Sequence, residues 1–310
     1  MERSGDARAN GLLGFPPDAR LLIVNCDDFG LYPAVNRAVV ESVEDGIAGS
    51  CSLMPGCPGG PDAMRLLHGH PALPFGIHLT LVCETPRNPW GPVAARGTVP
   101  SLLDDRGALF APTPAGRSAL LARARIEEVE TEFRAQIDTV DAAGLSPTHL
   151  DFHCLADGGR DDILDLTRHL AAEYGLAVRV WLDPARRELR RQGLPVVDHD
   201  FLDSFSLGLD GKAEQYTRLL HELPPGLSEW AVHPGSGSAE ARAADPDWRV
   251  RQTDHAFLTS PLSHDLIRAE GVTVIDYTAL RELWPGRPSP ADPSLADPSP
   301  ADPSPAVPPR

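Results

Sequence analysis

The sequence predicts an α/β protein with a mostly parallel sheet. Apolar, strand-like segments alternate with helix-like segments about seven times along the chain, which is the pattern of repeated β–α units. The 310 residues are 42% hydrophobic, enough for one large core. Periodicity leaves open whether the sheet closes into a barrel, but in either form ligands bind beyond the carboxyl ends of the strands.

The elements follow from apolar spacing and from helix end signals. Strands are expected at 21–26, 50–56, 75–81, 148–153, 177–181, 229–235 and 272–276. A helix is expected at 33–46, because Pro33 suits a first turn and Gly46 suits the position after the end. A long helix is expected at 116–143, because apolar residues recur there every three or four positions. Further helices are expected at 163–174 and 262–270.

Both ends differ in composition from the centre. Residues 1–20 are polar and contain no apolar signal region, so we expect a flexible N-terminus and no secretory signal. Residues 286–310 repeat a Pro-Ser-Ala-Asp unit, which predicts a disordered tail, either passive or binding a partner. One domain is expected at 21–285.

Charge and cysteine content limit the partners and the compartment. A net charge of −16 argues against a nucleic-acid partner and against an anionic membrane surface. No apolar stretch is long enough for a membrane span, which needs about 18 residues. Five cysteines without a C-x-x-C pair predict free thiols and a cytoplasmic protein. The oligomeric state stays open, and a homo-oligomer is compatible with the sequence.

Polar residues end or interrupt four of the expected strands. They are Asp27 and Asp28 in "IVNCDDFG", His78 in "FGIHLTL", His149, Asp151 and His153 in "PTHLDFH", and His233 in "AVHPG". Positions i, i+2 and i+4 of a strand share one face, so the third group is expected to point into a site. A divalent cation would relieve the repulsion between the adjacent aspartates, and one Asp with two His is a common ligand set. The remaining carboxylate would then be free to act as a base.

These four segments, in this order, resemble the YdjC-like carbohydrate deacetylases, the family that includes chitooligosaccharide deacetylase. The resemblance implies a deformed (β/α) barrel and the removal of an acetyl group from an N-acetylated sugar or related glycoconjugate. It assigns the metal ligands to Asp28, His78 and His153, the base to Asp27 and a candidate general acid to His233. His149 or Asp151 would orient a histidine from behind. The metal would be Mg²⁺ or Zn²⁺.

The sequence is also compatible with other functions. The same ligand set also suits a metal-dependent amidohydrolase or phosphoesterase of a non-sugar substrate on the same scaffold. A binding protein without activity and an interaction protein acting through its tail are the non-enzymatic alternatives. The tryptophans are assigned to packing, with Trp90 the best candidate among them for stacking on a sugar.

Overall fold

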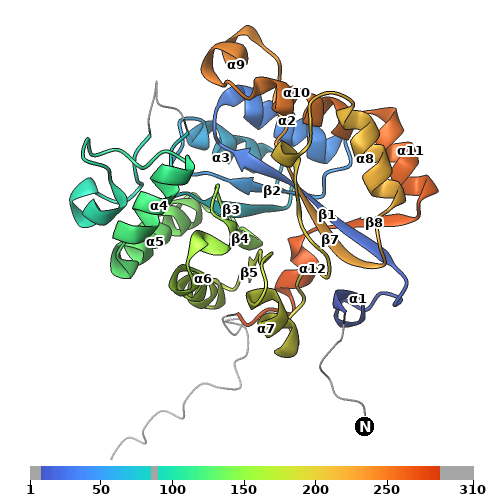
Figure 1. Cartoon of the computed structure of the whole chain (residues 1–310), viewed down its shortest axis with the longest axis horizontal. Coiled ribbons are helices and arrows are strands. Elements are labelled where there is room, and N and C mark those ends of the chain that lie inside the picture. The colour runs from blue at the N-terminus through green and yellow to red at the C-terminus, as the bar shows by residue number, and fades with distance from the viewer. Residues whose placement is uncertain (1–7, 85–89, 287–310) are drawn as a thin grey trace, which may run out of the picture.

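The computed structural model describes residues 8–84 and 90–286, which form one curled parallel sheet covered by helices (Figure 1). The strands are β1 Arg20–Phe29, β2 Ser50–Leu53, β3 Phe75–Leu79, β4 His149–Phe152, β5 Ala177–Val178, β6 Leu202–Asp203, β7 Gly226–Val232 and β8 Val272–Ile275. The helices are α1 Ala9–Leu12, α2 Pro33–Glu44, α3 Gly60–Gly69, α4 Pro114–Arg123, α5 Ile126–Ala142, α6 Asp161–Tyr174, α7 Ala185–Arg191, α8 Lys212–His221, α9 Ala239–Ala244, α10 Trp248–Leu258, α11 Pro261–Ala269 and α12 Tyr277–Arg281.

The eight strands confirm the expected α/β class and the deformed barrel. Hydrogen-bonded neighbours run in the order β5-β4-β3-β2-β1-β7-β6, and every pairing between these strands is parallel. β8 pairs with the first half of β1, and β2 pairs with its second half. Among the described residues no ladder joins β5 to β6, so the sheet curls without closing.

Strand β1 is the centre of the core. Its residues Leu21 to Phe29 are all buried. β7 flanks one edge of the strand, and β8 and β2 share the other. A strand buried on both faces explains the continuous apolar run at the start of this segment. The carboxyl end of β1 therefore lies in the middle of the sheet, where the side chains at the ends of neighbouring strands can meet.

The long helix expected at 116–143 is two helices, α4 and α5. Ala124 and Arg125 between them have extended backbone, with ψ of 123° and 134°. The side chain of Arg160 donates to the Ala124 carbonyl, and the Arg125 N–H donates to the Ser101 hydroxyl. These side chains satisfy backbone groups that a continuous helix would have paired internally, so the break is stable.

The N-terminal segment expected to be loose is folded from residue 8 onward. Ala9 and Asn10 of α1 are buried, and the Asn10 amide donates to the carbonyls of Pro16 and Ala19. This side chain closes the turn that leads into β1. Residues 1–7 and 287–310 lie outside the described residues, so the predicted disordered tail and the domain boundaries remain predictions.

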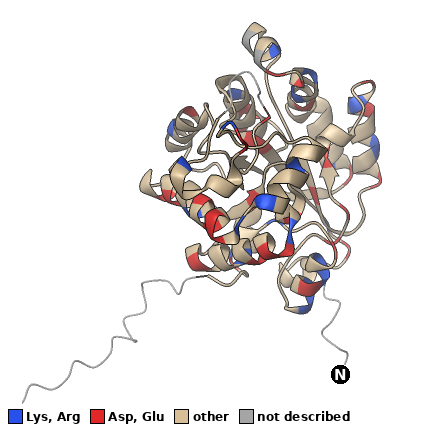
Figure 2. Ribbon diagram, turned by 60° about the vertical axis from the view of Figure 1, so that its left-hand side comes forward, with Lys and Arg blue, Asp and Glu red and all other residues tan. Residues whose placement is uncertain are grey.

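Charged residues of both signs are dispersed over the outer helices and loops (Figure 2). Where the chain is described, no helix has both the length and the apolar character that crossing a bilayer requires.

Gly30, two residues after the paired aspartates, occupies a backbone position that only glycine fits. Its φ is +106°, and a Cβ there would lie 2.7 Å from the Met54 carbonyl oxygen. We expect Gly30→Ala to lower the free energy of unfolding by about 2–3 kcal/mol, from backbone strain and the clash together. Thermal unfolding measures this loss. Gly144→Ala is the control, because Gly144 has φ +72° but open space around it. Equal shifts in the two variants would contradict the clash.

Candidate metal centre and catalytic site

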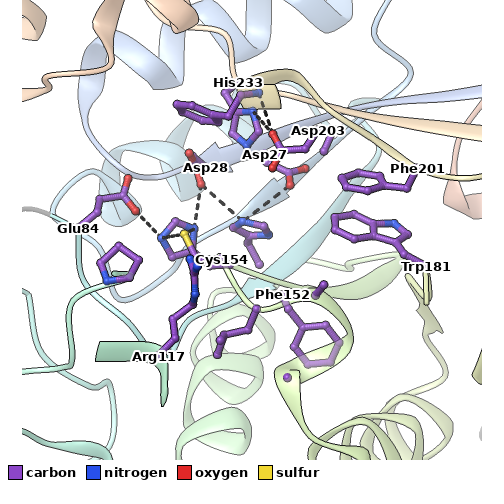
Figure 3. Close-up of a pocket in the computed structure, with 18 of the residues that line it drawn as sticks. Asp27, Asp28, Glu84, Arg117, Phe152, Cys154, Trp181, Phe201, Asp203 and His233 are labelled. Atoms are coloured by element: carbon purple, nitrogen blue, oxygen red, sulfur yellow. Dashed lines mark hydrogen bonds and ion pairs between the residues drawn. The ribbon is translucent and has the colours of Figure 1, made fainter. Parts of the chain in front are cut away.

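A cavity of about 640 Å³ opens beyond the carboxyl ends of the strands (Figure 3). Five of the seven residues predicted from the sequence line it: Asp27, Asp28, His78, His153 and His233. They come from β1, from β3 and from the residues that directly follow β4 and β7. The structure thus brings together side chains that are up to about 200 positions apart, because parallel strands end at one edge.

Three donor atoms converge on one point at the cavity floor. The Oδ1 atom of Asp28 lies 3.1 Å from His153 Nδ1 and 3.5 Å from His78 Nε2. All three residues are buried, and their donor atoms lie within 4.8 Å of one another. Asp28 Oδ1 is buried without a well-aligned hydrogen-bond donor. A buried carboxylate oxygen left in this state, facing two imidazole nitrogens, fits a divalent cation.

The backbone at Asp28 turns its side chain into this position. Asp28 has φ +66°, in the left-handed region, and the pairing of β1 with β2 changes register between Cys26 and Phe29. A bulge of this kind redirects a side chain relative to the strand pleat. The two adjacent aspartates therefore both reach the cavity, although consecutive strand residues normally face opposite sides.

Asp151 orients one of the donor histidines. Its Oδ1 lies 2.7 Å from His78 Nδ1, which leaves His78 Nε2 directed at Asp28. Metal-ligating histidines are commonly fixed by a carboxylate in this way. His149 lies deeper and does not line the cavity: its Nε2 is 3.8 Å from Asp151 Oδ2, and its ring stacks on Tyr277.

The charges of the site adjust one another's pKa values. Burial raises the pKa of Asp28. Arg251 and the two histidines lower this pKa by more than burial raises it, so it lies well below its usual range. Burial lowers the pKa of His78, but Asp151 and Asp27 outweigh this and raise it to about 10. These directions favour an ionised Asp28 facing a protonated His78 when no cation is bound.

Asp27 is held by a buried arginine. Both of its oxygens lie 2.9 Å from the Arg179 guanidinium, and the Asn25 amide donates to Oδ1 at 2.7 Å. Burial raises the pKa of Asp27, but Arg179 and His78 lower it below its ordinary value overall. Its Oδ2 is 3.9 Å from His78 Nε2, so an ionised carboxylate borders the donor cluster. Arg179 also contacts Asp151 and Glu229 at 2.8 Å.

Several residues of the site were missed in the sequence. Arg179 and Glu229 lie inside apolar strand segments, and a charge in such a run is the signal that could have indicated them. Arg251 lies 2.8 Å from Asp28 Oδ2. It belongs to a helix that carries other charged residues, so nothing in the sequence marks it as part of the site. Trp90 is 7% exposed and is not part of the cavity lining; Trp181, stacked on Phe201, lines the cavity instead.

The chain is similar to proteins of one known family. The family model described as YdjC-like protein matches residues 21–269. A carbohydrate deacetylase of Geobacillus stearothermophilus is 30% identical over 265 residues, which cover 85% of this chain and 99% of that protein. A chitooligosaccharide deacetylase of Serratia marcescens is 31% identical over 205 residues, covering 66% of this chain and 75% of its own.

Among solved structures, one from Enterococcus faecalis V583 superposes with a TM-score of 0.71 at 25% identity. The alignment covers 84% of this chain and 99% of that one, a protein to which cellobiose-phosphate cleavage has been ascribed.

Proposed function

Because this chain belongs to the YdjC-like protein family, we propose that it is a metal-dependent hydrolase that removes the acetyl group from an N-acetylated sugar. The expected enzyme class, a carbohydrate N-deacetylase, agrees with the names of its relatives. These names favour a sugar substrate over the non-sugar amide and phosphate alternatives. A cytoplasmic location and a homo-oligomer stay predictions.

One observation carries the proposal: the donor atoms of Asp28, His78 and His153 share a cavity with Asp27 and His233. The three donors would hold a divalent cation, Mg²⁺ or Zn²⁺. When bound, such a cation polarises an acyl oxygen and lowers the pKa of water. An acid–base pair beside it completes the requirements for hydrolysis of an amide.

The chain's own residues then divide the proton transfers. Asp27 is ionised and fixed by Arg179, so it can accept a proton from the attacking water. Water oxygen bonds to the acetyl carbon, and the resulting tetrahedral adduct collapses as the C–N bond breaks. His233 would donate a proton to the departing nitrogen, which leaves as the sugar amine, and acetate is the second product.

The direct test incubates the metal-loaded protein with a panel of N-acetylglucosamine-containing compounds and measures released acetate. We expect release from at least one member of the panel, and removal of metal by a chelator should abolish it. Release of phosphate from non-sugar phosphate esters without any acetate would support the phosphoesterase alternative instead.

Metal binding is expected to release protons and to tighten as pH rises. Neutral imidazole is the ligand, whereas the pKa of His78 in the metal-free site is about 10. Burial lowers the pKa of His153, but Cys154, Glu84 and Asp28 raise it more, to well above its ordinary value. Between pH 7 and 9 the affinity should therefore rise about 10- to 100-fold per pH unit, for one or two protons displaced.

Calorimetry in buffers of different ionisation enthalpy measures this proton count. A metal affinity that is independent of pH across that range would contradict the site. His149→Gln is the control, because His149 borders the network without facing the cavity, and its loss should leave proton release nearly unchanged.

A further inference from the structure

We propose that Ser204 and Asp254 form a hydrogen-bonded relay that positions His233 as the proton donor to the leaving amine. The inference rests on the proposed deacetylase function, which it deepens. Ser204 belongs to the short turn Ser204–Ser206 after β6, Asp254 belongs to α10, and His233 directly follows β7. Three separate elements therefore meet behind one candidate acid.

The direction of each hydrogen bond follows from the chemistry of the hydroxyl. Ser204 Oγ lies 2.6 Å from Asp254 Oδ2 and 2.8 Å from His233 Nδ1. A serine hydroxyl has one hydrogen, and an ionised carboxylate can only accept, so the hydroxyl donates to Asp254. Ser204 Oγ must then accept from His233, which places a proton on Nδ1. Nε2 is left as the nitrogen available to the cavity that His233 lines.

Asp254 is built to stay in place. Its Oδ2 also accepts from the His233 backbone N–H at 3.0 Å, so it fixes the main chain and the side chain together. Its Oδ1 accepts from the Tyr216 hydroxyl at 2.9 Å and forms an ion pair with Lys212. Lys212 is the only lysine of the sequence and is 3% exposed. A buried ammonium group without a charged partner would destabilise the fold, and Asp254 is the partner of Lys212 here.

Other groups also face the imidazole. Asp203 Oδ1 lies 3.9 Å from His233 Nδ1 on a half-exposed side chain, and the Phe205 ring packs edge-on at 4.5 Å. The contact with Ser204 is the short, buried one, so it decides which nitrogen carries the proton.

The relay matters for one step of the reaction. With Nδ1 already protonated, His233 carries a proton on Nε2 only as the imidazolium. Asp254, acting through the Ser204 hydroxyl, stabilises that cation. As the C–N bond breaks, the Nε2 proton passes to the amine nitrogen, and His233 returns to the neutral Nδ1–H form. Ser204 and Asp254 touch no substrate in this step and act as positioning residues.

The test is Ser204→Ala, with Ser206→Ala as its matched control on the same turn. Ser206 is exposed, and its hydroxyl donates to the Asp203 carbonyl rather than to the relay. We expect Ser204→Ala to lower kcat on an N-acetylated sugar about 10- to 100-fold, less than the full loss of a general acid. KM and metal content should change less than twofold, because neither serine touches the substrate or the three donor atoms.

A second readout does not depend on activity. Nitrogen-15 NMR of selectively labelled histidine, assigned with His233→Gln, reports the neutral tautomer of His233. The native protein should show Nδ1–H, and Ser204→Ala should lose this preference. An Nε2–H tautomer in the native protein, or equal kcat in the two serine variants, would overturn the relay. If no acetate is released by the native protein, the proposed function fails, and the tautomer still tests the relay.

Discussion

Replacing Asp28 by asparagine is expected to empty the proposed metal site and to lower kcat/KM by at least about 1,000-fold, because a bound cation supplies several kcal/mol of transition-state stabilisation. Asparagine tolerates the positive φ of +66° at this position better than alanine does. It also keeps an oxygen facing Arg251, which lies 2.8 Å from Asp28 Oδ2. The substitution removes the negative charge from Oδ1, the atom directed at His78 and His153.

Elemental analysis of the purified variant measures the metal, and acetate release measures turnover. Asp245→Asn is the matched control, because Asp245 is buried and pairs with the same Arg251 at 2.7 Å. It removes a carboxylate from that arginine without touching the three donor atoms, so metal content should stay native. An Asp28→Asn protein that holds one ion per chain and turns over normally would refute the ligand assignment.

The convergence of the donor residues in one cavity could be predicted from the sequence, because it follows from the parallel direction of the strands. Parallel strands present their carboxyl ends at one edge, so polar residues that end separate apolar runs should converge. Depth along a strand is harder to predict. His149, Asp151 and His153 share a face, but β4 ends at Phe152 and only His153 lies beyond it. His149 is four residues back, about 13 Å along the strand, and is buried beneath the site.

The partners of the aspartates could not be predicted in the same way. Arg179 is 152 positions from Asp27, and Arg251 approaches Asp28 from helix α10. Nothing local to a helix distinguishes a buried, paired arginine from one on a solvated face. The break between α4 and α5 could not be predicted for the same reason, because Arg160 and Ser101, which stabilise it, lie outside both helices. Interactions over such distances depend on the assembled fold.

Asp27→Asn is expected to keep the metal and to lose 10²- to 10⁴-fold in kcat, the range for removal of a general base. The amide retains the shape of the carboxylate but cannot accept the water proton. Arg179 keeps its contacts with Asp151 and Glu229, so the buried guanidinium remains paired and the fold should persist. Elemental analysis, acetate release and thermal unfolding check the three parts of this expectation.

Asp151→Asn distinguishes the proposed general base from a residue that only orients a metal ligand. Asp151 contacts the same Arg179, but it also receives the His78 Nδ1 hydrogen bond at 2.7 Å. Its loss should weaken metal affinity about 10- to 100-fold and leave most of kcat intact when metal is saturating. The two variants thus exchange their effects: Asp27→Asn spares metal and loses turnover, whereas Asp151→Asn spares turnover and loses metal. If Asp27→Asn instead hydrolysed the sugar at the native rate, another group would have to be the base.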